Sequence, residues 1–269
     1  MFFGGKRWLT LSKRRKSLNE IQNLVDNAAH LLIIHYSCES FYDIKDGRTP
    51  RITSIAVRYF NTGQTETFSI HKVAEKKGYL AEIESHYDEL EKIMLGEFYK
   101  FVKTHLNYNW IHWSMRDINY GFQAIDHRFS VLGGKPTSIL DSQKFDLARK
   151  LMDIYADYAD HPRLEKLIEL NNITKKDFLS GAEEAEAFEE LKYVELHRST
   201  LRKVDIFHSI LERVIDKSLK TKSKWHHIYG FTPQGMFESI KDHWIFALIS
   251  LIVGAALSAV LGIVFLDFF

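Results

Sequence analysis

The chain has 269 residues, of which 45% are hydrophobic, and this is enough apolar material for one sizeable core. Its formal net charge of +1 neither indicates nor excludes a nucleic-acid partner. The single cysteine, Cys38, excludes an intramolecular disulfide framework and a zinc site built from cysteines.

The N-terminal segment, residues 1–29, combines a basic run with a predicted helix. Residues 13–16 read K-R-R-K, a pattern that suits acidic lipid headgroups or a phosphate backbone and is also typical of a solvated helix face. Basic residues interrupt the apolar ones in this segment, which excludes a secretory signal peptide. Residues 17–29 show the apolar spacing of a short amphipathic helix.

A buried strand is predicted next, within residues 30–41. Leu31–Ile34 is an unbroken apolar run, which is typical of a strand covered on both faces. Polar groups appear only at the end of the run, as Ser37, Cys38 and Glu39. Because side chains alternate along a strand, we expect Ser37 and Glu39 to share one face and the Cys38 thiol to lie in the core.

The elements that follow indicate a mixed α/β sheet rather than a uniform βαβ repeat. Further strands are predicted at 52–60, 65–71, 110–113 and 138–141, and a turn containing Gly63 joins the first two as a hairpin. Helices are predicted at 80–105, from Asp117 to Gly133–Gly134, and at 145–158, 163–170, 183–191 and 193–217. Acidic residues gather at 183–190 and are predicted to form a solvated face.

A transmembrane helix is predicted over residues 244–266. The stretch has no charged residue, and at about 1.5 Å per residue it exceeds the roughly 30 Å hydrocarbon core of a bilayer. A buried core helix is the alternative. The preceding linker, 218–243, is rich in lysine, so the positive-inside rule predicts a single-pass protein whose N-terminal region is cytoplasmic.

Small residues recur every four positions in this predicted span, as Gly254, Ser258 and Gly262. Such a stripe lets two helices pack closely, which suggests a homodimer. Small residues are also common in spans that do not dimerise, and the two alternatives stay open.

Three carboxylates are expected where strands and helices meet. Glu39 ends the first strand, Asp117 follows the strand at 110–113, and Asp205 lies on the last long helix near His197. Carboxylates at one sheet edge suit Mg²⁺ or Mn²⁺, and paired ions can stabilise the oxygens of a phosphodiester while a histidine activates water. The structural alternatives are a surface acid at Glu39, a helix cap at Asp117 and solvated helix residues at Asp205 and His197.

These residues stand in a region, from about Leu31 to Val214, that resembles the DEDD family of 3′–5′ exonucleases and its ribonuclease-H-like fold. Ser37-Cys38-Glu39 occupies the position of the family's Asp-x-Glu, and His112–Asp117 resembles its second motif. The third motif of the histidine branch, His-x4-Asp, is matched by His197 and Asp205 at a longer spacing. Ser37 departs from the family, because a hydroxyl cannot supply the charge of the first aspartate.

The resemblance implies a site in which Glu39, Asp117 and Asp205 hold one or two Mg²⁺ or Mn²⁺ ions and His197 acts as base. The predicted organisation is a basic segment and helix (1–29), an exonuclease-like domain (30–217), a basic linker (218–243) and a transmembrane helix (244–266).

Two functions follow as hypotheses, and single-stranded DNA or RNA is the expected partner of both. The first is a membrane-anchored 3′–5′ exonuclease at the cytoplasmic face of the membrane. The second, favoured by Ser37 and the small-residue stripe, is an inactive pseudo-exonuclease that senses nucleic acid or nucleotides and signals to the span. A role in anti-phage defence is a fold-level analogy. A purely structural anchor is a third alternative, which no residue pattern favours.

Overall fold

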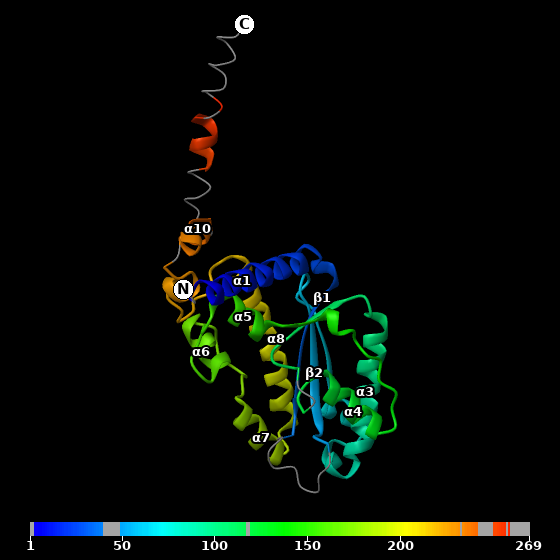
Figure 1. Ribbon diagram of the computed structural model, residues 1–269. Coiled ribbons are helices and arrows are strands. Elements are labelled where there is room, and N and C mark those ends of the chain that lie inside the picture. The colour runs from blue at the N-terminus through cyan, green and yellow to red at the C-terminus, as the bar shows by residue number, and fades with distance from the viewer. Residues whose placement is uncertain are drawn as a thin grey trace.

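The computed structural model describes residues 3–39, 49–116, 119–231, 233–241, 250–256 and 258. A five-stranded sheet in the order β3-β2-β1-β4-β5 lies at the centre of the fold (Figure 1). The strands are β1 (Leu31–Cys38), β2 (Ile52–Tyr59), β3 (Thr65–Ser69), β4 (Asn109–His112) and β5 (Lys144–Asp146). β2 runs antiparallel to β1 and β3, whereas β4 runs parallel to β1 and β5. The predicted mixed α/β class is confirmed.

Helices cover both faces of this sheet (Figure 1). They are α1 (Phe3–Asp26), α2 (Ile70–Lys77), α3 (Tyr87–Thr104), α4 (Phe122–Val131), α5 (Leu147–Tyr155), α6 (Arg163–Leu170), α7 (Gly181–Glu189), α8 (Tyr193–Ile215), α9 (Trp225–Ile228) and α10 (Pro233–Lys241). Short 3₁₀ turns lie at 28–30, 80–82, 84–86 and 141–143. Helices α3 and α4 pack on one face, and α5 and α8 pack on the other, with α1 against α5.

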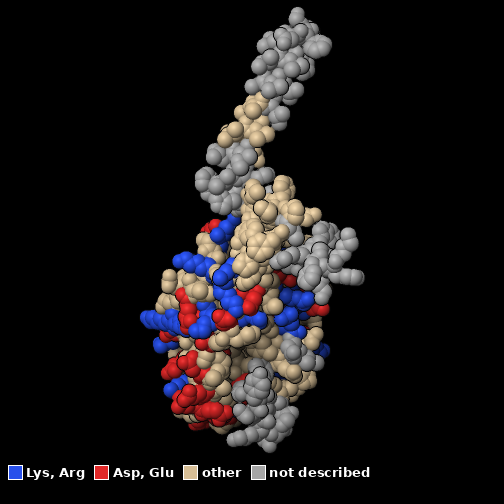
Figure 2. Space-filling view, turned by 60° about the vertical axis from the view of Figure 1, so that its left-hand side comes forward, with Lys and Arg blue, Asp and Glu red and all other residues tan. Residues whose placement is uncertain are grey.

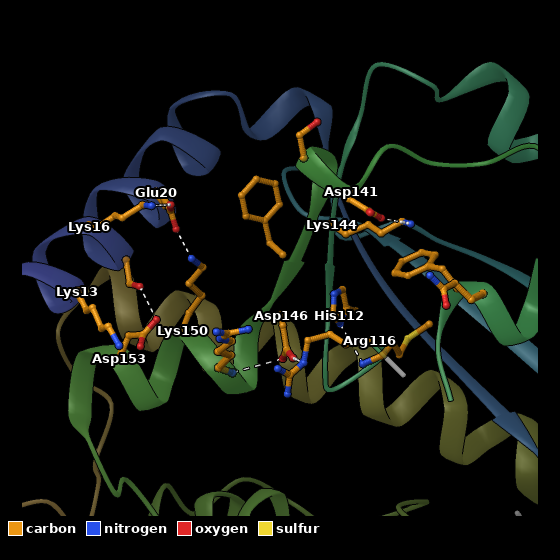
Figure 3. A pocket seen from close by; sticks show the side chains of 17 residues that line it. Lys13, Lys16, Glu20, His112, Arg116, Asp141, Lys144, Asp146, Lys150 and Asp153 are labelled. Carbon is orange, nitrogen blue, oxygen red and sulfur yellow. Dashed lines mark hydrogen bonds and ion pairs between the residues drawn. The ribbon is translucent and has the colours of Figure 1, made fainter. Parts of the chain in front are cut away.

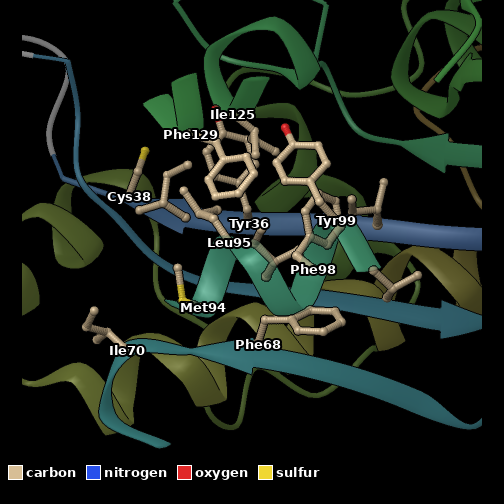
Figure 4. Packing of buried hydrophobic residues seen from close by; sticks show 14 of the residues in the cluster. Tyr36, Cys38, Phe68, Ile70, Met94, Leu95, Phe98, Tyr99, Ile125 and Phe129 are labelled. Carbon is tan, nitrogen blue, oxygen red and sulfur yellow. The ribbon is translucent and has the colours of Figure 1, made fainter. Parts of the chain in front are cut away.

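The alternation of β1 explains why the molecule has a core on each side of the sheet. Leu32, Ile34, Tyr36 and Cys38 point toward α3 and α4, and Leu31 and Ile33 point toward α5 and α8. Figure 4 shows the first core, where aromatic and aliphatic side chains of α3 and α4 fill the space over β1, β2 and β3. Each large side chain buried in this way stabilises the fold by about 1.5–3 kcal/mol.

The predicted hairpin is confirmed, with β2 and β3 paired from Ser54↔Ser69 to Arg58↔Thr65. Its turn needs a glycine, because residue 63 has a φ of +70°. The predicted end of α4 is confirmed as well. Gly133 has a φ of +76°, and a Cβ on Gly134 would lie only 2.3 Å from the Phe129 ring.

Four predicted boundaries are wrong. The short helix predicted at 17–29 is part of the 24-residue α1, which begins at Phe3 and ends at Asp26. The helix predicted from residue 80 begins as two 3₁₀ turns and becomes α-helical only at Tyr87. The helix predicted to begin at Asp117 begins at Phe122 instead, after Gly121. The strand predicted at 138–141 is β5 at 144–146, because Lys144, Phe145 and Asp146 pair with β4 while Leu140 is exposed.

Most of the predicted span 244–266 lies outside the described residues, which include only 250–256 and 258 of it. Gly262, the last residue of the small-residue stripe, also lies outside them. Within the described part of the chain, no helix combines the length and apolarity needed to cross a bilayer.

Candidate functional site

A cleft of about 360 Å³ opens at the C-terminal ends of β1 and β4, beside α7 and α8. We call it the β1 cleft. Its walls combine aromatic and ionisable side chains, among them His35, Glu39, Trp113, Tyr120, Glu184, Lys203 and Phe207. Carboxyl ends of strands are where open α/β sheets place their ligand sites.

Lys203 of α8 and Glu184 of α7 form an ion pair inside this cleft. Their nitrogen and oxygen are 2.7 Å apart, and the two side chains are only 7% and 12% exposed. The same Glu184 oxygen accepts hydrogen bonds from the hydroxyls of Ser37, at 2.9 Å, and Ser199, at 2.8 Å. A buried pair of this kind is stable only when further hydrogen bonds satisfy the carboxylate, as these hydroxyls do.

Ser37 therefore belongs to a hydroxyl network rather than to a carboxylate cluster. Its oxygen lies 2.7 Å from Thr200 Oγ1, which in turn lies 2.6 Å from Ser54 Oγ. The Cys38 thiol faces the opposite core, as predicted, and burial raises its pKa well above the usual value. The thiol is therefore neutral, and the sulfur is a packing group rather than a nucleophile.

Glu39 is the one predicted site residue that the described structure places in the β1 cleft. It is 6% exposed, and its Oε2 accepts a hydrogen bond from the backbone N–H of Arg51 at 3.1 Å. Glu39 N–H also donates to the Arg51 carbonyl at 2.9 Å, so the residue is held at the end of the β1–β2 pair.

The other two described candidates point elsewhere on α8. Asp205 forms an ion pair with Arg58 of β2 at 2.9 Å. His197 packs edge-on against His71 of α2, with ring centroids 5.1 Å apart, and burial lowers its pKa to about 3. Asp205 follows Lys203 by two residues, which is about 200° around the helix. It therefore points away from the cleft that Lys203 lines.

Asp117 lies outside the described residues. Among the residues that the structure does describe, no group of three or more His, Cys, Asp or Glu side chains is placed to hold a metal ion. Glu39, His197 and Asp205 are thus not brought together.

Aromatic side chains also line the cleft. Trp113 stacks on Phe207, with ring centroids 5.5 Å apart and planes at 10°, and Tyr120 stacks on Tyr36 at 4.8 Å. Trp113 precedes Ser114, whose φ of 55° is sparsely populated for a residue other than glycine. That conformation is held by a 3.1 Å hydrogen bond from Ser114 N–H to Asp146.

His35 places an unsatisfied polar atom on the cleft. The residue is 6% exposed, and its Nε2 has no hydrogen-bond partner among the described residues. Burial, with the charge of Lys203 as a second cause, lowers its pKa well below the usual value, so the imidazole is neutral. A neutral histidine with a free ring nitrogen can donate or accept one hydrogen bond from a ligand.

Sequence reasoning missed Glu184 and Lys203. The acids of α7 do gather on an exposed end of the molecule, visible in Figure 2, but the prediction of a solvated face is wrong for Glu184. A signal existed in α8: Ser199, Thr200 and Lys203 interrupt the helix face that Leu196 and Phe207 otherwise make apolar. Polar residues at core spacing indicate a buried polar network.

Comparison of the chain with family models, with curated proteins and with solved structures finds no match in any of the three.

Proposed function

We propose that this chain is an exonuclease-like binding module, which holds the end of a single-stranded nucleic acid in the β1 cleft without a metal ion and without cleaving it. One observation carries the proposal: the Lys203 ammonium is paired with Glu184 beside Ser37, the position where the resemblance implies a metal-bridging aspartate. The order of strand, hairpin, helix, strand, helix and strand supports the resemblance itself.

The residues present do not fit Mg²⁺ or Mn²⁺. Of the described acids, only Glu39 and Glu184 line the cleft, and Glu184 is already neutralised by Lys203. A divalent cation would have to compete with the Lys203 ammonium for the Glu184 carboxylate, in a poorly solvated site where charges interact strongly. Divalent ions prefer several oxygen ligands, and the hydroxyls of Ser37, Ser199 and Thr200 are weak substitutes for carboxylates.

The same groups suit a nucleic-acid strand. Trp113 is partly exposed on the cleft and is backed by the fully buried Phe207, so it offers an aromatic face on which a base can stack, as in other proteins that bind single strands. The Lys203 ammonium has three donors, so it can contact a phosphate as well as Glu184, and His35 supplies a polar ring nitrogen. The cleft is small, so it accommodates the last nucleotide of a strand rather than a duplex.

The test is polarisation of 3′-labelled single-stranded DNA and RNA of about ten nucleotides, mixed with the full chain in detergent. We expect equal binding in EDTA and in Mn²⁺, with the label still attached after prolonged incubation. Release of the label that depends on Mn²⁺ would show an active exonuclease and would contradict the proposal.

Variants of the ion pair locate the binding in the cleft. Lys203→Gln should weaken binding at least about tenfold, since it removes a charge-assisted contact. This change leaves the Glu184 carboxylate buried without its partner. The double variant Lys203→Gln/Glu184→Gln is therefore a second test, because two glutamines can still form a hydrogen bond with each other while the charge is removed. The control is Lys166→Gln, which removes a lysine from a 2.8 Å pair with Glu169 that is exposed on α6. Unchanged binding in the double variant would place the strand outside the β1 cleft.

The membrane anchor is a second part of the proposal. Its support in the structure is the short described helix 250–256, whose Leu251, Ile252 and Val253 side chains are all at least half exposed. Consecutive helical residues point in directions about 100° apart, so these three exposed apolar side chains cover more than half of the helix circumference. We propose that it belongs to a span at 244–266 that holds the domain at the cytoplasmic face.

A further inference from the structure

A second and larger cavity, of about 620 Å³, lies along β5 and beneath α1. We call it the β5 pocket. It is separate from the β1 cleft, because Trp113 and Ser114 line the cleft whereas His112, Met115 and Arg116 line the pocket. Figure 3 shows its side chains converging from α1, α5, β5 and the segment after β4.

The β5 pocket lies where the chain leaves the neighbouring strands β4 and β5 toward opposite faces of the sheet. After β4 the chain continues into α4, whose Phe122 and Ile125 pack in the first core. After β5 it continues into α5, whose Leu147 and Leu151 pack in the second core. In open α/β sheets, the crevice outside the carboxyl ends of two such strands is the favoured place for a ligand.

Cations outnumber acids around this pocket. Six line it, Lys13, Lys16, Arg116, Lys144, Arg149 and Lys150, against the four acids Glu20, Asp141, Asp146 and Asp153. Glu20 is shared by two of the lysines, Lys16 and Lys150. Lys144 pairs with Asp141 at 2.8 Å, and Arg116 pairs with Asp146.

Two of these six cations are not assigned to an ion pair. Lys13 and Arg149 form no ion pair within the described part of the chain, although they stand on different helices that face the same cavity. Asp153 also forms no ion pair among the described residues and accepts a hydrogen bond from Ser17 at 3.1 Å, so with six cations against four acids the pocket keeps an excess of positive charge. The unpaired cations lie where an anionic ligand would complete the charge balance.

The buried acid of the pocket has a structural role. Asp146 is 6% exposed and caps α5 by accepting the N–H of Arg149 at 3.3 Å, in addition to that of Ser114. Its charge is thus offset by backbone donors and Arg116 and repels an anion only weakly. His112 beside it is neutral, because burial lowers its pKa to about 4.

An apolar wall completes the pocket. Met115, Phe122 and Phe145 line it. Phe122 is 6% exposed and has the Lys144 ammonium 5.1 Å from the centre of its ring, whereas Phe145 is partly exposed. The pocket thus offers cations for phosphate groups and the exposed part of the Phe145 ring for a base. Its volume is within the range of pockets for small ligands and cofactors, about 300–1,000 Å³.

We propose that the β5 pocket binds a nucleoside di- or triphosphate, with the phosphates between Lys13 and Arg149 and the base against Phe145. This site is independent of strand binding in the β1 cleft.

The experiment is calorimetric titration of the full chain in detergent with three probes: ATP, inorganic tripolyphosphate and adenosine. We expect ATP to bind, tripolyphosphate to bind more weakly and adenosine to show no binding. Equal binding of ATP and tripolyphosphate would overturn the nucleoside assignment. Absence of ATP binding would overturn the site.

Matched variants identify the pocket. Lys13→Gln/Arg149→Gln should weaken ATP binding at least about tenfold without lowering thermal stability, because neither side chain forms an ion pair among the described residues. The control, Lys100→Gln/Lys103→Gln, removes the same charge from the exposed surface of α3 and should leave binding unchanged. An equal loss in both variants would show non-specific attraction and overturn the proposal.

The two proposed sites are distinguished by crossed variants. Lys203→Gln/Glu184→Gln should leave ATP binding intact, whereas Lys13→Gln/Arg149→Gln should leave strand binding intact. Loss of ATP binding in Lys203→Gln/Glu184→Gln, with thermal stability retained, would place the nucleotide in the β1 cleft and overturn the β5 pocket.

Discussion

Two buried ion pairs, Lys203–Glu184 and Arg128–Glu91, have different surroundings. The first lies on a cleft and is supported by hydroxyl groups. The second lies between α3 and α4, where Glu91 is fully buried and also accepts the backbone N–H of Ile52 at 2.7 Å. Burial raises the pKa of Glu91, while the guanidinium of Arg128 acts to lower it. We therefore assign the first pair to binding and the second to stability.

Glu91→Ala should lower the free energy of unfolding by about 3–5 kcal/mol, because it leaves the Arg128 charge buried without its main partner. Asp88→Ala is the control. Asp88 also pairs with Arg128, at 2.6 Å, but its side chain is 65% exposed, so we expect a loss below about 1 kcal/mol. Urea denaturation measures both losses, and equal losses would contradict the assignment.

His197 should make stability depend on pH. Its pKa falls from 6.5 to about 3 on burial, so below pH 6.5 the unfolded chain binds a proton that the folded chain excludes. The stabilisation is complete above pH 6.5 and is lost as pH falls toward 3. His197→Phe should reduce the slope of unfolding free energy against pH by up to about 1.4 kcal/mol per unit between pH 6 and 4. Urea titrations across this range measure the slope, and an unchanged slope would show that His197 is not the proton-linked group.

At the scale of elements, α8 presents three faces with different roles. Thr200, Lys203 and Phe207 face the β1 cleft and its hydroxyl network, while His197 faces α2 and Asp205 faces β2. The sequence resemblance pairs His197 with Asp205 on spacing alone. Spacing specifies an angle around a helix but not which face meets the sheet, and the apolar residues decide that.

Helix α1 is the second element with more than one role, because it packs on α5 and contributes lysines to the β5 pocket. We expect it to unfold together with the rest of the domain. Leu24 is 6% exposed in the second core, so Leu24→Ala should lower the unfolding free energy by about 2–5 kcal/mol. The exposed neighbour Asn19→Ala is the control, and equal stability of the two variants in urea would show that α1 detaches separately.

At the scale of the whole molecule, the proposed anchor predicts membrane association. The full chain should float with phosphatidylcholine and phosphatidylglycerol vesicles after an alkaline wash. Leu251→Arg/Ile252→Arg should abolish flotation, since each arginine costs about 2.5–3.5 kcal/mol at the centre of a span. The control Val131→Arg/Leu140→Arg changes two exposed apolar residues of the body. If the double arginine variant still floats, the anchor lies elsewhere.

Much of the architecture could be predicted, because its signals are local. The apolar run of β1, the turn at Gly63 and the period of α6 and α8 each specify an element within a few residues. The candidate site could not be predicted in the same way. The Lys203–Glu184 pair joins two helices, and β5 is defined by pairing with β4 rather than by its own composition. Such contacts arise only when distant segments meet.

The double role of α1 has a practical consequence for shortened forms of the chain. Arg14 stacks on the Tyr229 ring at 4.9 Å and donates a hydrogen bond to its hydroxyl, and Arg15 pairs with Glu238 of α10. The opposite flank of the helix carries Lys13 and Lys16 into the β5 pocket. A crystallisation fragment that stops before Tyr229 lacks the partner of Arg14. A fragment that starts after Asp26 lacks Arg14 itself and also the two lysines of the β5 pocket. The fragment to express is therefore 3–241, which retains Arg14 and Arg15 of α1 together with their partners Tyr229 and Glu238.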